Sequence, residues 1–542
     1  MSYLALARIS LGADKSESAA VHLLARLLEA QAQGIASVDL RPGQAEELLL
    51  SGQAKRAGEG DPGPMRPIVI DGDWALLSRT HELLSSLRRL LQQRAGDSLA
   101  TLCDQREIER VFGPETDGRD GSQRAAVRGL LTQKLGVLTG GPGTGKTSTA
   151  ASFLALRFFL DPSLEAEQVL LAAPTGKAAK RLEQSIRAAA LEGGRLAQAG
   201  LPVARLRQLH ARTLHKTLGW TPVPPERGGP YRHGAQAPLN ARIVLVDEAS
   251  MVDLSLFHHL LLALPPDCQL ILLGDEDQLE SVEIGGTLSD LIRRHPASVF
   301  RLDHCFRSES RDILELAQAF RPGAKKRPSW EAVCELLQRP TLAFRPLSPY
   351  SASLPAEVKK HLLEQWKPFR ESCRKIRLDD AESQAAAWRA LNAFQVLCAQ
   401  REGQGGVEEI NRIGLGVDLS RGLSLPHGTP LMITRNERTL DLSNGDLGIV
   451  VRDVAADISR VIFPHREPLS LAQLPAHEVA WALTIHKSQG SEFGRCALFL
   501  PPQADSPLLT HNLLYTAITR AKAEVKLFGQ LESLQRMLGE KG

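Results

Sequence analysis

Residues 140–147 read GGPGTGKT and match the phosphate-loop pattern G-x-x-x-x-G-K-[ST] at every fixed position. An apolar run at 135–139 precedes them and an Ala-rich helical pattern at 148–159 follows, which predicts strand, loop and helix in that order. In such a loop backbone N–H groups cradle phosphate oxygens, Lys146 neutralises the β- and γ-phosphates, and Thr147 offers a hydroxyl to Mg²⁺. A turn that merely joins a strand to a helix is the alternative. The pattern favours a nucleoside triphosphate site.

A second chemical signal is the carboxylate pair Asp247 and Glu248, which ends the aliphatic run 243–246. In phosphate-loop enzymes the first carboxylate holds Mg²⁺ through water and the second acts as general base on the attacking water. Another apolar run, 270–273, leads to Gln278, which could sense the γ-phosphate. Buried runs alternating with helical patterns predict a parallel, doubly wound sheet.

Three further segments contain residues that could bind a ligand, although these residues also have a purely structural explanation. Gln123 opens a helix just before the first strand, and its amide could read the adenine edge because it donates and accepts at once. Thr175 and Lys177 follow the buried run 169–173, at the strand end where such sheets place ligands. These two residues suit a phosphodiester backbone, although a solvated turn would look the same. Thr213 and His215 leave the same two possibilities open.

The composition sets limits on partners and compartment. The 542 residues imply roughly three to four domains. Because the net charge is only +3, nucleic-acid binding would have to come from local grooves. The seven cysteines form no C-x-x-C pair, which argues against a disulfide framework, a zinc site or an iron–sulfur cluster. With no signal peptide and no membrane-length apolar run recognised, we expect a cytoplasmic protein without a membrane partner.

The chain divides into three predicted domains. Residues 1–110 carry no catalytic signature and predict a small α-rich domain with a hairpin at 68–77, which either keeps its own core or docks on another subunit. Residues 111–300 form a first αβ domain with the phosphate loop and a hairpin insertion near 221–240. Residues 301–542 form a second αβ domain with a β-rich insertion near 412–475.

Two arginines of the second αβ domain are candidates for the γ-phosphate. Only the first domain has a phosphate loop, so ATP is expected where the second domain can supply Arg307 and Arg520. An arginine that reaches the transferring phosphate contributes roughly 10³–10⁵ in rate. Either residue could instead form a surface ion pair.

The motifs together resemble those of superfamily-one helicases of the RecD type. Segments 140–147, 173–179, 247–253, 274–282, 481–493 and 514–522 are similar to motifs I, Ia, II, III, V and VI of that family. Residues 302–307 resemble its motif IV, 394–411 the start of its second motor domain, and 444–448 its NGDiG turn. The resemblance extends over most of the chain, from Gln123 to Lys522.

The resemblance implies an α/β protein with two RecA-like motor domains. It implies an ATP- and Mg²⁺-dependent motor that moves 5'-to-3' on single-stranded DNA, drawn from double-stranded ends during break repair and recombination. The partners implied are RecB-like and RecC-like subunits in a heterotrimer, with residues 1–110 docking on the RecC-like subunit. No nuclease centre is visible, so cutting would belong to a partner. The alternatives are an ATP-binding regulatory subunit without unwinding activity, a stand-alone RecD-like helicase, and an RNA helicase.

The candidate site residues that follow from the patterns and the resemblance fall into four groups. They are catalytic Lys146, Glu248, Gln278, Arg307 and Arg520; ATP-binding Gln123, Gly140, Gly141, Pro142, Gly143, Thr144, Gly145, Lys146, Thr147, Ser148, Asp247 and Gly490; DNA-binding Thr175, Lys177, Thr213, His215, His486, Lys487 and Ser488; and metal-binding Thr147 and Asp247.

Overall fold

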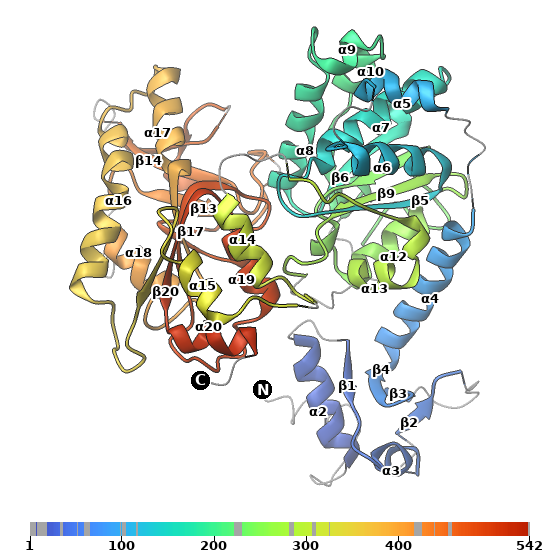
Figure 1. Cartoon of the computed structure of the whole chain (residues 1–542), viewed down its shortest axis with the longest axis horizontal. Helices are drawn as coiled ribbons and strands as arrows, with labels where there is room; N and C mark the ends of the chain where they lie inside the picture. The colour runs from blue at the N-terminus through green and yellow to red at the C-terminus, as the bar shows by residue number, and fades with distance from the viewer. Residues whose placement is uncertain are drawn as a thin grey trace. The chain divides into compact units, whose positions relative to one another are not determined.

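The chain forms two compact units (Figure 1). Unit 1 comprises Met1–Pro174, Ala179–Glu276 and Glu280–His304, and unit 2 comprises Thr175–Ala178, Asp277–Leu279 and Cys305–Gly542. The computed structural model describes residues 7, 19–32, 36–50, 53–58, 66–97, 99, 104–114, 118–221, 230–280, 287–305, 311–324, 326–416, 425–437, 439–453, 458–464 and 466–539.

The N-terminal part of unit 1 is a four-stranded sheet covered by helices. The sheet order is β1-β4-β3-β2, and β3 and β4 form the expected antiparallel hairpin. Expecting an α-rich domain missed β1 and β2, because strands of three residues show no alternation in sequence. A small separate core includes Leu23, Leu27 and Ile68. The elements are α2 (Ala19–Ala32), β1 (Ser37–Asp39), α3 (Gln44–Leu50), β2 (Ala54–Arg56), β3 (Ile68–Asp71) and β4 (Trp74–Leu77).

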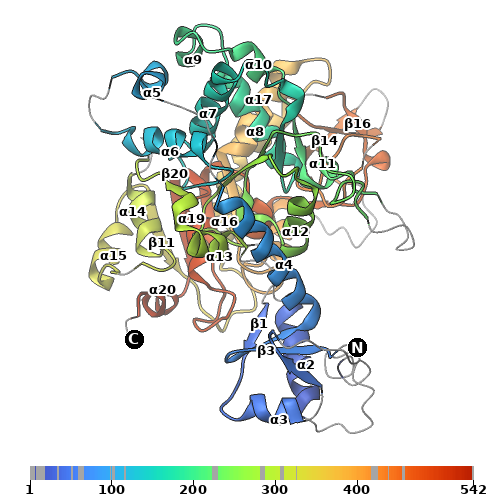
Figure 2. The ribbon, with the colours of Figure 1, turned by 90° about the vertical axis from the view of Figure 1, so that its right-hand side faces the viewer.

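Helix α4 (Ser78–Ala95) leads from this small sheet to the larger one, as Figure 2 shows. Its leucine stripe, which includes Leu87 and Leu91, is buried in the same core as α12 (Leu254–Ala263). The buried Arg94 donates to the carbonyls of Leu264, Pro265 and Cys268, each over 3.1 Å, just after the end of α12. Although it lies within the predicted residues 1–110, α4 is thus fastened to the core of the larger sheet.

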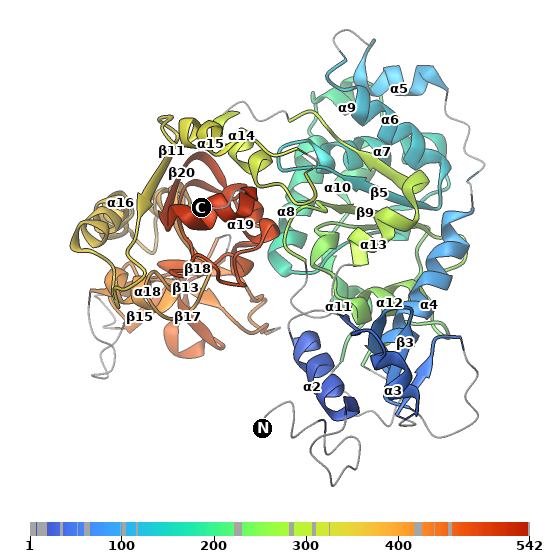
Figure 3. The same cartoon turned by 60° about the horizontal axis from the view of Figure 1, so that its bottom comes forward.

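The larger sheet of unit 1 is six-stranded and parallel, in the order β10-β5-β9-β8-β6-β7. Its strands are continuous apolar runs because helices cover both faces: α6, α7 and α8 on one face, α4, α12 and α13 on the other (Figure 3). The elements are α5 (Gln105–Phe112), α6 (Gly121–Thr132), β5 (Leu135–Thr139), α7 (Lys146–Leu160), η1 (Ala166–Gln168), β6 (Val169–Ala173), α8 (Gly176–Ala189), α9 (Arg195–Gln198), α10 (Val203–Arg207), β7 (Ala211–Thr213), α11 (Leu214–Thr217), β8 (Ile243–Val246), η3 (Ala249–Met251), β9 (Gln269–Gly274), α13 (Thr287–Arg294), η4 (Pro296–Ser298) and β10 (Val299–Arg301).

The register of this sheet brings the carboxyl ends of its strands to one edge. Thr139 at the end of β5 lies opposite Gly274 at the end of β9. Val246 at the end of β8 lies opposite Ala172, one residue before the end of β6. The phosphate loop and the residues after β8 therefore share this edge.

Unit 2 has a five-stranded parallel sheet, β11-β20-β19-β12-β18, with apolar cores on both faces. A second, antiparallel sheet, β16-β15-β14-β13-β17, lies within residues 430–479. The elements are α14 (Arg311–Ala319), α15 (Trp330–Leu336), β11 (Leu342–Pro346), α16 (Ala356–Arg374), α17 (Ala381–Ala393), β12 (Phe394–Cys398), α18 (Val407–Leu415), β13 (Pro430–Ile433), β14 (Leu447–Asp453), β15 (Ile458–Ile462), β16 (Leu469–Ser470), η6 (Leu471–Gln473), β17 (His477–Val479), β18 (Ala482–Thr484), η7 (His486–Ser488), β19 (Phe493–Phe499), α19 (His511–Ile518), β20 (Ala521–Gly529) and α20 (Leu531–Leu538).

Candidate functional site

The phosphate loop joins the fully buried strand β5 to helix α7, which begins at Lys146. Gly143 and Gly145 have φ of 78° and 84°, a left-handed backbone that favours glycine. A Cβ at Gly140 would lie 2.8 Å from both the carbonyl oxygen of Leu302 and Oγ1 of Thr144. The glycines are therefore required by the backbone path of the loop and by its packing.

Side chains of the loop and of α6 hold this path in place. Nζ of Lys146 donates to the carbonyls of Gly140 (2.6 Å) and Gly141 (3.2 Å), so the ammonium lies over the loop. Oγ1 of Thr144 also donates to Gly141, over 2.8 Å. Nε2 of Gln123, a residue only 7% exposed, donates to the carbonyl of Thr144 over 3.2 Å. Gln123 thus braces the loop through its amide nitrogen, a contact that the adenine hypothesis did not include.

The remaining loop residues differ in accessibility. Gly141, Pro142 and Thr147 are half-buried, whereas Ser148 is exposed in the first turn of α7. Since N–H groups in the first turn of a helix lack intrahelical partners, this turn can receive phosphate oxygens.

Asp247 and Glu248 follow β8 directly and lie in a tight turn. The backbone N–H of Glu248 donates to Oδ1 of Asp247 over 2.9 Å. Burial, followed by the charge of Glu248, raises the pKa of Asp247 to about 6, while Lys146 and Arg181 act in the opposite direction. Glu248 has a φ of 52°, a left-handed conformation that costs a residue with a side chain about 1–3 kcal/mol. Strain of this kind is typical of functional positions.

The donors at this edge fit Mg²⁺. Within the described ranges there is no group of three or more His, Cys, Asp or Glu residues that could hold a metal ion by themselves. Mg²⁺ at nucleotide sites usually takes only one or two protein oxygens and completes its shell with phosphate oxygens and water. Asp247 can supply one such oxygen and Thr147 another. A cation beside Asp247 would favour its ionised form and so offset the burial and the Glu248 charge that raise its pKa.

Two residues that the sequence separates by 242 positions, Gln278 and Arg520, meet inside unit 2. Nη2 of Arg520 donates to Oε1 of Gln278 over 2.8 Å. Its Nε and Nη1 donate to the carbonyls of Thr516 (3.1 Å) and Ser491 (3.2 Å), and the arginine is only 3% exposed. The guanidinium is therefore held rigidly, with its charge next to the amide predicted to sense the γ-phosphate.

The short stretch 277–279 is fixed by α19. Nδ2 of Asn512 donates to the carbonyls of Asp277 (3.3 Å) and Gln278 (3.2 Å). The N–H of Leu279 donates to Oγ1 of Thr516 over 2.8 Å. Sequence inspection missed Asn512 and Thr516, although both lie in the 511–518 helix that leads to Arg520.

Thr175 and Lys177 both make contacts within unit 2. Oγ1 of Thr175 accepts from the N–H of Ala178 over 3.2 Å and so caps α8. Nζ of Lys177 donates to Oγ of Ser491 over 2.6 Å. Arg181, another residue that sequence inspection missed, follows Lys177 by one helical turn. Its positive charge acts to lower the pKa of Asp247. Its signal was the i, i+4 spacing after a predicted ligand-binding turn.

Thr213 and His215 lie at the end of β7. Oγ1 of Thr213 accepts from the N–H of Lys216 over 3.2 Å and caps the short helix α11. His215 is exposed, with its ring centroid 6.4 Å from that of Trp220 and 6.1 Å from that of Tyr231. Residues 222–229 of the predicted hairpin insertion lie outside the described residues, as does Arg307.

The predicted residues of segment 486–490 differ in burial, in side-chain partners and in backbone conformation. His486 is half-buried, and this burial lowers its pKa. Nζ of Lys487 donates to Oε1 of Glu478 over 2.6 Å. Gly490 has a φ of 70°, which only glycine adopts readily.

Ser488 requires a correction. Its side chain is fully buried and its Oγ donates to the carbonyl of Ile485 over 2.6 Å. The hydroxyl thus stabilises the turn of η7 and is not accessible to DNA. The sequence could not show this, because the direction of a serine side chain in a tight turn depends on the backbone around it.

Two parallel α/β sheets carry the features described above: a phosphate loop, a strand that ends in two carboxylates, and a buried Arg–Gln pair. Together these features define a phosphate-loop NTPase of the motor class. Two family models match the chain: an AAA domain over residues 123–283 and a UvrD-like helicase C-terminal domain over residues 479–528.

Curated relatives extend this match to nearly the whole chain. "RecBCD enzyme subunit RecD" of Mycolicibacterium smegmatis is 32% identical over 96% of this chain and 91% of its own length. The protein of the same name from Mycobacterium tuberculosis is 36% identical over 83% of this chain and 76% of its own length. "ATP-dependent RecD2 DNA helicase" of Deinococcus radiodurans is 31% identical over 75% of this chain and 48% of its own length. The chain belongs to the RecD family, and it is an ATP-dependent DNA helicase.

Solved structures of Pif1 helicases are also similar. Bacteroides Pif1 bound to single-stranded DNA has 16% identity and a TM-score of 0.41, covering 75% of this chain and 91% of its own. Among the residues that the structure describes, no helix has both the length and the apolar character needed to cross a membrane.

Proposed function

We propose that this chain is the 5'-to-3' motor subunit of a RecBCD-like helicase–nuclease that processes double-stranded DNA ends in break repair and recombination. Its partners would be a RecB-like and a RecC-like subunit in a heterotrimer, and its compartment the cytoplasm. The names of its relatives support this assembly, since they are called subunits of the RecBCD enzyme. The residues N-terminal to α4 would dock on the RecC-like subunit.

The observation that carries the motor function is the buried bond between Arg520 and Gln278. A regulatory subunit that only binds ATP would need neither residue. Gln278 accepts a hydrogen bond from Arg520, and both side chains would contact the γ-phosphate when ATP is bound. Loss of the γ-phosphate would therefore change the hydrogen-bond partners of both side chains at once. Arg307 would act as a second cation on the γ-phosphate. This shared response would convert hydrolysis into movement.

The chemistry proposed for hydrolysis uses groups of this chain. Lys146 would exchange its loop carbonyls for β- and γ-phosphate oxygens. Glu248 would accept a proton from the water whose oxygen attacks the γ-phosphorus, while the bond from that phosphorus to the bridging oxygen of ADP breaks. Mg²⁺, held through Thr147 and Asp247, would neutralise charge on the phosphate oxygens. Gln123 would position the loop, and Gly490 would let the 486–490 turn approach the nucleotide.

The proposed DNA contacts are directed at the backbone of a single strand. Thr175 and Thr213 use their hydroxyl oxygens as helix caps, which leaves the hydroxyl proton of each for a phosphate oxygen. Lys177, His215, His486 and Lys487 would add charge or donors. Such contacts make binding independent of sequence and sensitive to salt.

ATP hydrolysis by the purified chain, with and without single-stranded DNA, tests the motor function. Hydrolysis should rise strongly with DNA and be lost in Lys146→Ala. Lys134→Ala is the matched control. Lys134 precedes β5, the strand that leads into the phosphate loop, but its side chain is paired with Asp97 and Asp267. It should retain the stimulated rate.

The same assay with co-expressed RecB-like and RecC-like subunits tests the assembly. Stimulation that appears only in the complex would support a subunit that depends on its partners. If ATP binds but DNA never accelerates hydrolysis in either setting, the chain is a regulatory subunit and the motor proposal fails.

A further inference from the structure

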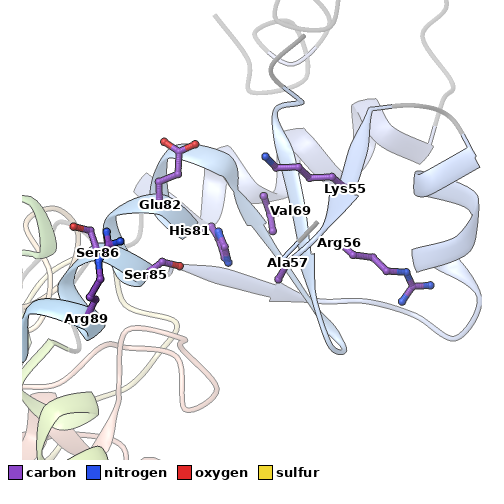
Figure 4. Close-up of a pocket in the computed structure, with 10 residues that line it drawn as sticks. Lys55, Arg56, Ala57, Val69, His81, Glu82, Ser85, Ser86 and Arg89 are labelled. Carbon is purple, nitrogen blue, oxygen red and sulfur yellow. The ribbon is translucent and has the colours of Figure 1, made fainter. Parts of the chain in front are cut away.

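A cavity of about 440 Å³ lies in unit 1 between the small N-terminal sheet and α4 (Figure 4). Strand β2 contributes Lys55, and β3 contributes Val69. Helix α4 contributes one polar stripe, which includes His81, Ser85 and Arg89. A volume in the usual range of ligand pockets, about 300–1,000 Å³, is large enough for a nucleotide unit and larger than a single ion needs.

Two of the cations that line this cavity, Lys55 and Arg89, have no partner among the residues that the structure describes. The side chains of Lys55 and Arg89 make no hydrogen bond or ion pair with any described residue, and the same holds for His81 and Ser85. Glu82, the one carboxylate of the lining, is exposed and pairs with neither cation within the described ranges. Arg56 points away from the other labelled side chains (Figure 4). The cavity thus offers two free cations, a hydroxyl and an imidazole, with Val69 as a small apolar wall.

The helical wall of this cavity packs against the core that carries the phosphate loop. Ser86, which also lines the cavity, has its Oγ 2.9 Å from Nε2 of His258 in α12. Leu87 and Leu91 are buried on the opposite side of α4, and Arg94 bonds three carbonyls after α12. A ligand held here is therefore held by the body that binds the nucleotide.

We propose that this cavity binds a phosphodiester group of DNA, at a place separate from the strand in the motor's path. Lysine, arginine and serine donors are the usual partners of nucleic-acid phosphates. The exposed Glu82 would keep a continuous polyanion from lying flat and limit the contact to one or two phosphates. The inference rests on the proposed DNA motor, and it adds a second anchor that resists slippage while the motor resets.

The test compares DNA affinity of the full chain and two variants over a range of salt concentrations. Lys55→Ala/Arg89→Ala removes both cations of the cavity. Arg79→Ala is the matched control, because Arg79 is an exposed arginine of the same helix that does not line the cavity. Fluorescence anisotropy would be measured with a labelled single strand and with a labelled forked duplex.

The double variant should bind the forked duplex about tenfold or more weakly at moderate salt. Its slope of log K against log salt should fall by about 0.9 for each lost duplex contact, while Arg79→Ala stays within about twofold of the parent. ATP hydrolysis at saturating single-stranded DNA should be unchanged, so failure here is distinct from failure of the motor. An unchanged slope, or equal losses in Arg79→Ala, would overturn the proposal. So would intact DNA binding combined with loss of partner subunits from the purified complex, which would assign the cavity to an acidic protein segment.

Discussion

At the scale of single residues, Asp247 makes the stability of the nucleotide-free chain sensitive to pH. Its pKa is raised to about 6, so the folded state favours the protonated carboxyl. The free energy of unfolding is therefore highest below the unfolded pKa of about 3.9 and falls as pH rises towards the folded pKa of about 6. Above that pH it is lower by up to about 3 kcal/mol. Asp247→Asn should therefore raise the melting temperature of the nucleotide-free chain at about pH 8 and give roughly a third of that gain at about pH 4.5.

Thermal unfolding of the parent and Asp247→Asn across this pH range is the measurement. A difference in melting temperature that does not change with pH would contradict the assigned cause. Because an amide oxygen lacks the negative charge of the carboxylate proposed to hold Mg²⁺, the stabilised variant should also lose most of its ATP hydrolysis.

Gln278 allows a second prediction on single residues. Gln278→Glu would turn its bond to Arg520 into a buried ion pair, which is stronger than the present bond from the charged guanidinium to a neutral amide. The new carboxylate would also repel the γ-phosphate and hold Arg520 back from it. We expect DNA-stimulated hydrolysis to fall about 10³-fold, as it does when an arginine finger is lost, without loss of folding. A variant with normal kcat would show that Arg520 does not act on the phosphate.

At the scale of elements, helix α4 connects the small N-terminal sheet to the core that carries the phosphate loop. Arg94→Met keeps the apolar stem but removes the guanidinium donor from the carbonyls of Leu264, Pro265 and Cys268, of which that of Pro265 still accepts from the N–H of Cys268 at 3.1 Å. Unpaired buried acceptors cost about 1–3 kcal/mol each, so we expect a loss of about 3 kcal/mol and protease cleavage near α4. Arg79→Ala, on the exposed side of the same helix, should leave stability unchanged.

Elements also show what a sequence can reveal. The strand–loop–helix at residues 135–160 and the strand before Asp247 were predictable, because their motifs are contiguous and their burial produces unbroken apolar runs. Strands β1 and β2 were not, because three residues carry no periodic pattern. The Arg520–Gln278 bond and the buried hydroxyl of Ser488 depend on tertiary packing, which local spacing does not encode.

At the scale of the whole molecule, direction of travel is the property that the proposed function requires and that no single contact determines. A motor moving 5'-to-3' should displace streptavidin from a biotin at the 3' end of a single strand and leave one at the 5' end in place. Because the proposed grips contact the backbone, displacement should depend little on base sequence and fall steeply with salt. Lys146→Ala should displace neither. Displacement from the 5' end alone would reverse the polarity proposed for this subunit, yet leave its identity as a motor intact, since both ends require the same ATP chemistry.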